Sequence, residues 1–152
     1  MRWGGLNSYF FNLRAGVRQG GVLSPFFFAI YIDRIVAEIK AAHVGCHIAS
    51  TCVSVFLYAD DILLLSPSVT GLQTLLTICE NVLSDLDMRL NGKKSVCMRF
   101  GARFNAPCTN ITSIHGGPLQ WVTRCRYLGV YLTSGRQFRC SFDKAKSGSA
   151  HF

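Results

Sequence analysis

Acidic residues are scarce in this sequence and unevenly placed. The 152 residues include 8 Asp and Glu against 16 Lys and Arg, so the formal net charge is +8. Residues 1–32 contain no acid, and Asp33 is the first carboxylate of the chain. This balance favours polyanionic partners, nucleic acid first and an anionic membrane second. A basic protein without any such partner is the alternative that charge alone leaves open.

Charged residues of both signs are few, at 16%, whereas hydrophobic residues make up 49%. This composition excludes a disordered chain, and the length suffices for one domain with its own core. The apolar runs at 26–32 and 53–65 are too short to span a bilayer, and no signal peptide stands out. We therefore expect a soluble, intracellular domain that makes no membrane contact.

Paired cysteines are also lacking. The chain has seven cysteines, an odd number, and no two of them form a Cys-x-x-Cys pair. Cys46 and Cys52 lie near His43 and His47, but this spacing matches no ordinary zinc site. We expect buried free thiols in a reducing compartment instead of disulfides or zinc.

Two segments have the periodicity of amphipathic helices. Ser24 and Pro25 suit the N-cap and the first helical position, and Gly45 ends that helix at the latest. Its apolar face consists of Phe28, Ile32, Ile35 and Ile39. Ser68 can cap the second helix. The core-facing positions of that helix are Leu72, Leu75, Leu76, Cys79, Val82, Leu83 and Leu86.

The remaining segments predict short strands. Residues 51–58 and 62–66 are apolar and rich in β-branched or aromatic residues, which predicts a hairpin of two buried strands with 59–61 at the bend. Residues 14–21 form a glycine-rich loop. Further strands are expected at 9–13, 96–100, 111–114, 120–122 and 127–132. The order β-α-β-β-α-β-β-β predicts an α+β fold.

Asp60 and Asp61 are adjacent acids inside this hydrophobic hairpin. Two like charges in an apolar setting repel each other and lose hydration, and a divalent cation is the usual compensation. Mg²⁺ prefers hard oxygen ligands, and a pair of metal ions can clamp the oxygens of a phosphoryl transfer. A solvated turn whose acids face water is the alternative for the pair taken alone.

The motif Tyr58-Ala59-Asp60-Asp61 resembles the YxDD box of reverse transcriptases. Residues 16–25, Gly-Val-Arg-Gln-Gly-Gly-Val-Leu-Ser-Pro, resemble the GxRQGxxLSP segment of the same enzymes, in the same order and separation. Residues 90–95 resemble the loop with the family's lysine, and 126–132 resemble the segment that grips the primer. Among reverse transcriptases, these motifs resemble those of non-LTR (LINE-type) retrotransposons. The resemblance extends from about residue 9 to residue 146.

The resemblance implies a partial polymerase palm over residues 1–132, in which an antiparallel sheet with the Tyr-Ala-Asp-Asp hairpin packs on two helices. Residues 133–152 would be the truncated start of a thumb or connection segment. The fingers and the N-terminal part of the palm would be missing.

The resemblance also assigns roles at the catalytic centre. Asp60 would ligate the catalytic metal ions and Asp61 would support the site. Lys94 would approach the triphosphate, with Lys93 as the alternative if the register differs by one. A solvated surface lysine is the competing interpretation for either one.

Two further groups would contact nucleic acid and nucleotide. Arg18, Gln19 and Gly20 would line the nucleotide and template side together with Tyr58 and Ala59. The primer grip would consist of Tyr127, Leu128 and Gly129. Taken alone, residues 16–21 are also typical of an ordinary glycine turn before a helix cap, and residues 127–129 of a plain core strand.

The function implied is that of an RNA-directed DNA polymerase that takes an RNA template, a DNA primer and dNTPs and uses two Mg²⁺ (or Mn²⁺) ions. The family uses another aspartate on an earlier strand, which this chain lacks, and Asp33 lies inside a predicted helix. Asp60 and Asp61 together supply two negative charges, whereas two divalent cations carry about four positive charges. We therefore expect weak or absent metal binding and no polymerase activity from the chain alone.

Two other interpretations remain at this point. The chain could be a non-catalytic retroelement remnant that binds nucleic acid or has no selected function. It could also be a generic basic α+β domain in which the motifs occur by chance.

Overall fold

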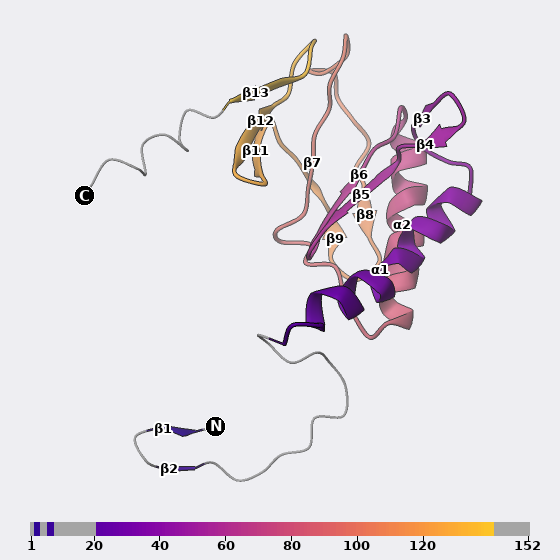
Figure 1. Ribbon diagram of the computed structural model, residues 1–152. Helices are drawn as coiled ribbons and strands as arrows, with labels where there is room; N and C mark the ends of the chain where they lie inside the picture. Colours follow the sequence, from indigo (N-terminus) through magenta and orange to yellow (C-terminus); the bar gives the residue numbers. More distant parts are fainter. Residues whose placement is uncertain (1, 4–5, 8–20, 142–152) are drawn as a thin grey trace.

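The computed structural model describes residues 2–3, 6–7 and 21–141 and has an α+β architecture of two helices and short strands (Figure 1). In chain order the elements are β1 (Arg2–Trp3), β2 (Leu6–Asn7), α1 (Ser24–Ala41), β3 (His47–Ile48), β4 (Thr51–Cys52), β5 (Val55–Tyr58), β6 (Asp61–Leu64), α2 (Val69–Asp85), β7 (Val96–Cys97), β8 (Thr112–Ser113), β9 (Gly117–Pro118), β10 (Gln120–Trp121), β11 (Arg124–Tyr127), β12 (Val130–Thr133) and β13 (Arg139–Ser141). None of the helices in the described segments is long and apolar enough to cross a membrane.

Both predicted helices are present, but only one has the predicted cap. Ser68 precedes α2 with an extended backbone, and its hydroxyl accepts a hydrogen bond from the Gly71 amide at 3.0 Å. The N-cap of α1 is Leu23, so the prediction for Ser24 was wrong by one residue. The reason is that Leu23 already has a helical backbone, with φ −88° and ψ −10°, which places Ser24 inside the helix.

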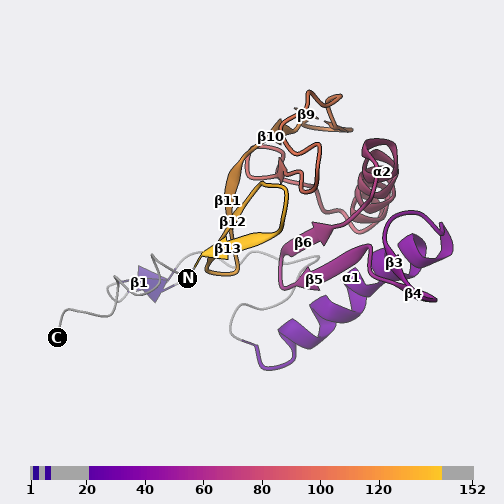
Figure 2. The same ribbon diagram turned by 90° about the horizontal axis from the view of Figure 1, so that it is seen from above.

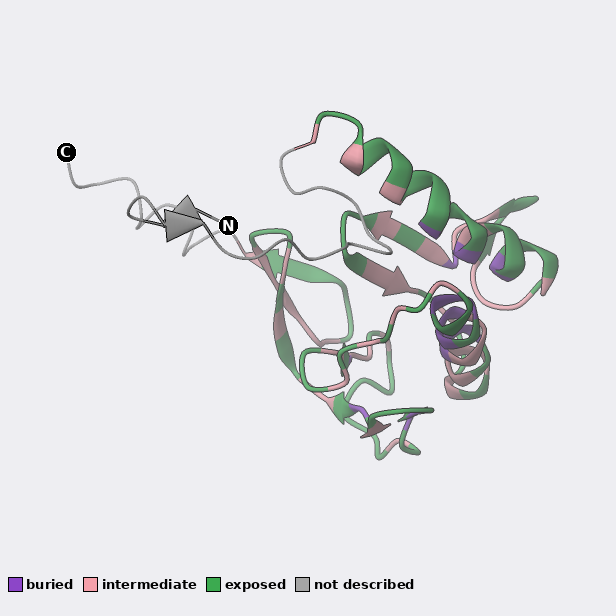
Figure 3. Cartoon of the chain, turned by 90° about the horizontal axis from the view of Figure 1, so that it is seen from below, coloured by how far each residue is buried: buried purple, intermediate pink, exposed green. Residues whose placement is uncertain are grey.

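The main core lies where α1 and α2 pack together against one face of the β5–β6 hairpin (Figure 2). Figure 3 shows the buried residues gathered along the facing sides of these two helices. The buried members are Ile32, Ile35, Ile39, Leu75, Cys79, Val82 and Leu83. At the surface, Arg34 and Asp85 join the two helices in an ion pair at 2.8 Å.

A second core lies on another side of α2, between Leu76 and the segments that carry β7, β8 and β10. Glu80 is buried there, and its carboxylate accepts hydrogen bonds from the Ser113 hydroxyl and from the Ile114 amide, the latter at 3.0 Å. Gln73 bonds the backbone of Thr112 twice, at 2.8 and 2.9 Å. These polar contacts hold the β8–β9 hairpin on α2 and compensate the burial of the Glu80 charge.

Several strand predictions need correction. The predicted strand 51–58 is divided, because Ser54 is fully buried and its hydroxyl lies 3.1 Å from the Val44 carbonyl oxygen and 3.0 Å from that of Cys46. The segment 127–132 is not one strand but contains the turn between β11 and β12. The strand predicted at 9–13 lies outside the described residues.

The region from residue 133 onward also differs from expectation at its start. β13 was not predicted, and it pairs with β12 in an antiparallel register that sets Thr133 opposite Arg139. Residues 133–141 therefore continue the β11–β12 sheet. The division of the chain into a palm at 1–132 and a thumb segment at 133–152 remains a prediction.

The seven cysteines are free, as expected, although only Cys79 and Cys97 are buried. Burial, with a contribution from Glu80, raises the pKa of the Cys79 thiol to about 12. Burial raises the pKa of Cys97 to about 11, with a smaller effect of Cys108. Such thiols stay protonated and behave as small apolar core residues.

Replacing Gly45 by alanine should destabilise the fold at the base of the acidic hairpin. Gly45 has φ +98°, and a methyl group there would meet the Ser54 side chain and lie 3.0 Å from the Leu65 carbonyl oxygen. Gly101 has a similar φ of +104° but open space around it, which makes Gly101→Ala the matched control. In urea denaturation we expect Gly45→Ala to lose at least about 1 kcal/mol more than the control. Equal losses of stability in the two variants would show that the left-handed backbone alone causes the effect, and not the crowding of the added methyl group by Ser54 and Leu65.

Candidate active site at the turns of two hairpins

The two acids lie at the end of the β5–β6 hairpin, as predicted, but the turn is tighter than expected. Tyr58 pairs with Asp61, which leaves Ala59 and Asp60 as a two-residue turn and places Asp61 on β6 instead of in the bend. Ala59 has φ +51°, a left-handed conformation that costs a residue with a Cβ about 1–2 kcal/mol. A strained turn of this kind occurs often at functional sites, where the surrounding packing holds it.

Only one face of the hairpin is covered, so the prediction of two buried strands was half right. Leu57 and Ile62 pair with each other and pack on the core of α1 and α2. The opposite face carries Tyr58, which is 64% exposed, and Phe56, which is 48% exposed. Asp61 pairs with Tyr58 and therefore lies on this open face.

The β11–β12 hairpin brings a second predicted group to the acids. Its turn consists of Leu128 and Gly129, with φ +47° and +84°. Tyr127 is half-buried next to this turn, and burial raises the pKa of its phenol above the usual value of about 10. The carboxylate of Asp61 raises that pKa further, so the phenol lies within electrostatic range of the acid.

The remaining predicted residues are less closely associated with the acids. Lys94 is exposed in a turn, where its amide bonds the Asn91 carbonyl at 3.0 Å and the Asn91 side chain at 3.3 Å. Within residues 21–141 no ion pair joins Lys94 to Asp60 or Asp61. Residues 18–20, the predicted Arg-Gln-Gly on the nucleotide side, lie outside the described part of the chain.

The acid pair fits part of a metal site. Asp60 and Asp61 are both exposed and offer the hard carboxylate oxygens that Mg²⁺ prefers. The described segments contain no group of three or more His, Cys, Asp or Glu side chains that could hold a metal ion, whether at these acids or around Cys46 and Cys52. The described residues therefore offer two carboxylates here, which is fewer than a complete metal site needs.

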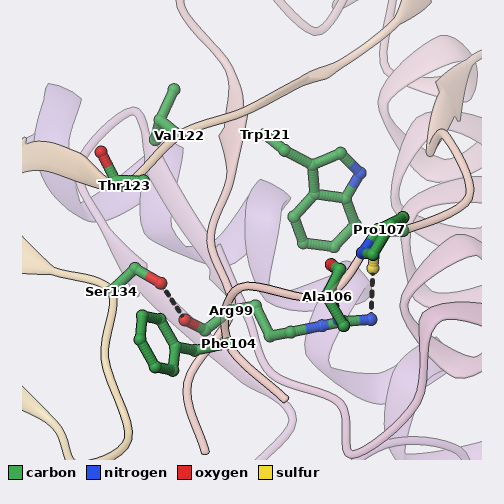
Figure 4. Close-up of a pocket in the computed structure, with 9 residues that line it drawn as sticks. Arg99, Phe104, Ala106, Pro107, Trp121, Val122, Thr123 and Ser134 are labelled. Carbon is green, nitrogen blue, oxygen red and sulfur yellow. Dashed lines mark hydrogen bonds between the residues drawn. The ribbon is translucent and has the colours of Figure 1, made fainter.

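A cavity of about 230 Å³, which the sequence did not indicate, is lined by Arg99, Trp121 and Ser134 among others (Figure 4). The guanidinium of Arg99 donates to the carbonyls of Arg103 and Ala106 and to the Cys108 sulfur. The hydroxyl of Ser134 donates to the Arg99 carbonyl. The side chain of Arg99 therefore holds the loop 99–108 together through its hydrogen bonds. Its backbone carbonyl connects this loop to Ser134 in the β12–β13 connection.

A second unpredicted feature lies on β11 and β12. The Arg124 guanidinium stacks over the ring of Tyr131 at 4.5 Å from the ring centre. The alternation of Arg124 and Arg126 around Cys125 is the sequence signal that could have revealed an outward-facing basic strand.

Residues 3–132 match the family described as reverse transcriptase (RNA-dependent DNA polymerase). The chain belongs to that family. The family resemblance is thereby confirmed, and the alternative of a generic basic domain with chance motifs is wrong. The Tyr-Ala-Asp-Asp hairpin and the Tyr127 turn both lie within the matched range.

Two curated relatives are Pol polyproteins of retrotransposable elements, which agrees with the non-LTR resemblance. The type-2 retrotransposable element R2DM of Drosophila melanogaster is 27% identical over 133 residues, or 83% of this chain and 12% of that protein. The type-1 retrotransposable element R2 of Popillia japonica is 35% identical over 91 residues, or 59% of this chain and 13% of that protein. The matched part of the chain thus spans about an eighth of the length of these relatives.

The proximity of Tyr127 and Asp61 can be tested by titration. In the Asp61→Asn variant we expect the phenol pKa of Tyr127 to fall toward its usual value, because a negative charge near the tyrosinate is removed. It should stay somewhat raised, since burial is the larger cause. The measurement is the pH dependence of tyrosinate absorbance, with Tyr127→Phe used to assign the signal.

Asp60→Asn is the matched control, because Asp60 is not among the groups that shift Tyr127. If both variants shift the titration equally, the hairpins are not arranged as described. The pKa of the Tyr127 phenol is higher in the folded chain than in the unfolded chain. Its contribution to stability is therefore fully present below about pH 10 and is lost as the pH rises through the folded-state pKa.

Proposed function

We propose that the chain is the second half of the palm of an RNA-directed DNA polymerase, followed by the start of the thumb, and that it works only as part of a longer protein. The observation that carries the proposal is the position of Asp60 and Asp61 at the exposed end of a hairpin whose other face is fixed on two helices. A rigid element of this kind is a good support for ligands that must be held in place.

In this proposal Asp60 and Asp61 hold the divalent cations of nucleotidyl transfer, Mg²⁺ or Mn²⁺, two in the complete enzyme. When bound, the ions stabilise charge on the transferring phosphate and on the attacking and leaving oxygens. Asp60 lies in the turn, whereas Asp61 lies on the strand opposite Tyr58 and within electrostatic range of Tyr127. This difference supports a ligand role for Asp60 and a supporting role for Asp61.

The neighbouring residues would position the substrates. Tyr58 shares the open face with Asp61, where a primer end and an incoming dNTP could contact it. Leu128 is 49% exposed at the turn next to Tyr127, which suits contact with a primer backbone. Arg18, Gln19, Gly20 and Lys94 are proposed to serve the template, the nucleotide and the triphosphate on the strength of the family motifs.

A second candidate function is a remnant that binds nucleic acid without catalysis. The incomplete metal site in the described residues favours it, because two carboxylates offset only half of about four positive charges. The two candidates differ in what happens when the missing part is supplied: a polymerase fragment gains activity in that context, and a remnant does not.

The isolated chain should show no template-dependent extension. The test is a primer-extension assay of the purified chain on an RNA template, with Mg²⁺ and then Mn²⁺. Weak metal binding is expected in parallel, measured by calorimetry with each metal alone. Clear extension by the chain without any added protein would contradict both expectations.

A chimera tests the polymerase assignment itself. We expect extension when the chain replaces the matching segment of the Drosophila R2 polyprotein. In that chimera Asp60→Asn should lower the extension rate by at least about 100-fold, because a metal ligand is lost. Asp85→Asn, which removes an exposed acid paired with Arg34, should have little effect. A folded chimera that does not extend, or in which both variants behave alike, would contradict the assignment.

A further inference from the structure

The three-stranded sheet β11–β12–β13 has two chemically different faces. Residues directly opposite each other in an antiparallel sheet share a face, and successive residues alternate. By this rule Arg124, Thr133 and Arg139 lie in one row across the sheet, and Arg126 and Tyr131 lie in the next. We call this set of five residues the arginine face.

The arginine face points away from the catalytic acids. The opposite face of β11 carries Cys125 and Tyr127, both half-buried, and Tyr127 is the residue within electrostatic range of Asp61. Arg124, Arg126 and Arg139 are all exposed. By the register, the three arginines lie on the face of the sheet opposite to the one that carries Tyr127.

Nothing acidic in the surrounding sequence balances these arginines. Between Asp87 and Asp143 the chain contains no Asp or Glu. The nine cations of that stretch are Arg89, Lys93, Lys94, Arg99, Arg103, Arg124, Arg126, Arg136 and Arg139. Among the described residues, no ion pair involves any arginine of the sheet.

The arrangement suits recognition of phosphates. Arg124 and Arg126 are two residues apart on one strand, about 7 Å, so their guanidinium groups can contact phosphates along one nucleic-acid backbone. Arg139 lies two strands away, about 10 Å across the sheet. The stacking of Arg124 on Tyr131 restricts one guanidinium before any ligand binds. Guanidinium groups bind phosphate through paired hydrogen bonds.

We propose that the arginine face is a second nucleic-acid surface, which binds the phosphate backbone of a template–primer hybrid on the side of the sheet opposite to the catalytic acids. The inference rests on the proposed function only for the identity of the polyanion. An anionic membrane is the less favoured ligand, because Tyr131 is half-buried under Arg124 and the arginine face offers no exposed large apolar side chain for insertion.

The test measures binding of the full 152-residue chain to a fluorescent RNA–DNA hybrid by anisotropy, between about 50 and 200 mM salt. In Arg124→Gln/Arg126→Gln/Arg139→Gln, the salt slope of log affinity should decrease by about 2 to 3, since three phosphate contacts are lost. Affinity should fall at least about tenfold. The triple lysine variant, which keeps the charges, should retain most of the slope.

The charge-matched control is Lys40→Gln/Arg89→Gln/Arg103→Gln, which removes three exposed cations outside the sheet. Equal losses in the two glutamine variants would overturn the inference, because net charge alone would then explain binding. So would unchanged binding in the sheet variant, or no hybrid binding by the parent chain. Stronger, arginine-dependent binding to phosphatidylserine vesicles would assign the surface to a membrane instead.

Protection from phenylglyoxal, which modifies guanidinium groups, tests the parent chain directly if a variant does not fold. Bound hybrid should protect Arg124, Arg126 and Arg139, but not Arg34; protection of Arg34 to the same extent would overturn the inference. A chimera without primer extension but with arginine-dependent binding would contradict the polymerase assignment alone. A chimera that extends but binds independently of these arginines would contradict the second surface alone.

Discussion

Two neighbouring carboxylates can be presented at the tip of an apolar hairpin only if something else holds that hairpin in place. Strands of four residues are too short to be stable by themselves in water. The packing of Leu57 and Ile62 on α1 and α2 provides the support, and the strained Ala59 turn depends on the same packing. The position of the two acids, and with it the proposed chemistry, depends on this attachment.

The sequence predicted best what depends on local periodicity. Helix α2 and its Ser68 cap were predicted because the apolar spacing and the capping residue act within a few residues. Strand pairing was predicted less well, since alternation cannot distinguish one strand over 127–132 from the arm, turn and arm of a hairpin. The left-handed backbone of Leu128, which no residue preference indicates, makes the turn.

Contacts between distant segments could not be predicted. Nothing in the sequence around Glu80 indicates that it is buried, or that its carboxylate accepts a hydrogen bond from Ser113, which lies 33 positions away. At the site, the acidic hairpin was predicted from Asp60 and Asp61 and their apolar flanks. The family resemblance assigned Tyr127 to a primer grip, but its electrostatic interaction with Asp61 was not predicted, because nothing in its own neighbourhood indicates a partner more than 60 positions earlier.

Helix α2 belongs to both cores, and this has a consequence for cooperativity. One side of the helix packs Leu75 and Cys79 against α1, while Leu76 packs toward the strands that follow. Neither half of the described chain can lose its structure without exposing part of the shared helix to water. The backbone amides of α2 should therefore exchange with solvent more slowly than those of any edge strand, and opening of the helix should approach the global unfolding event.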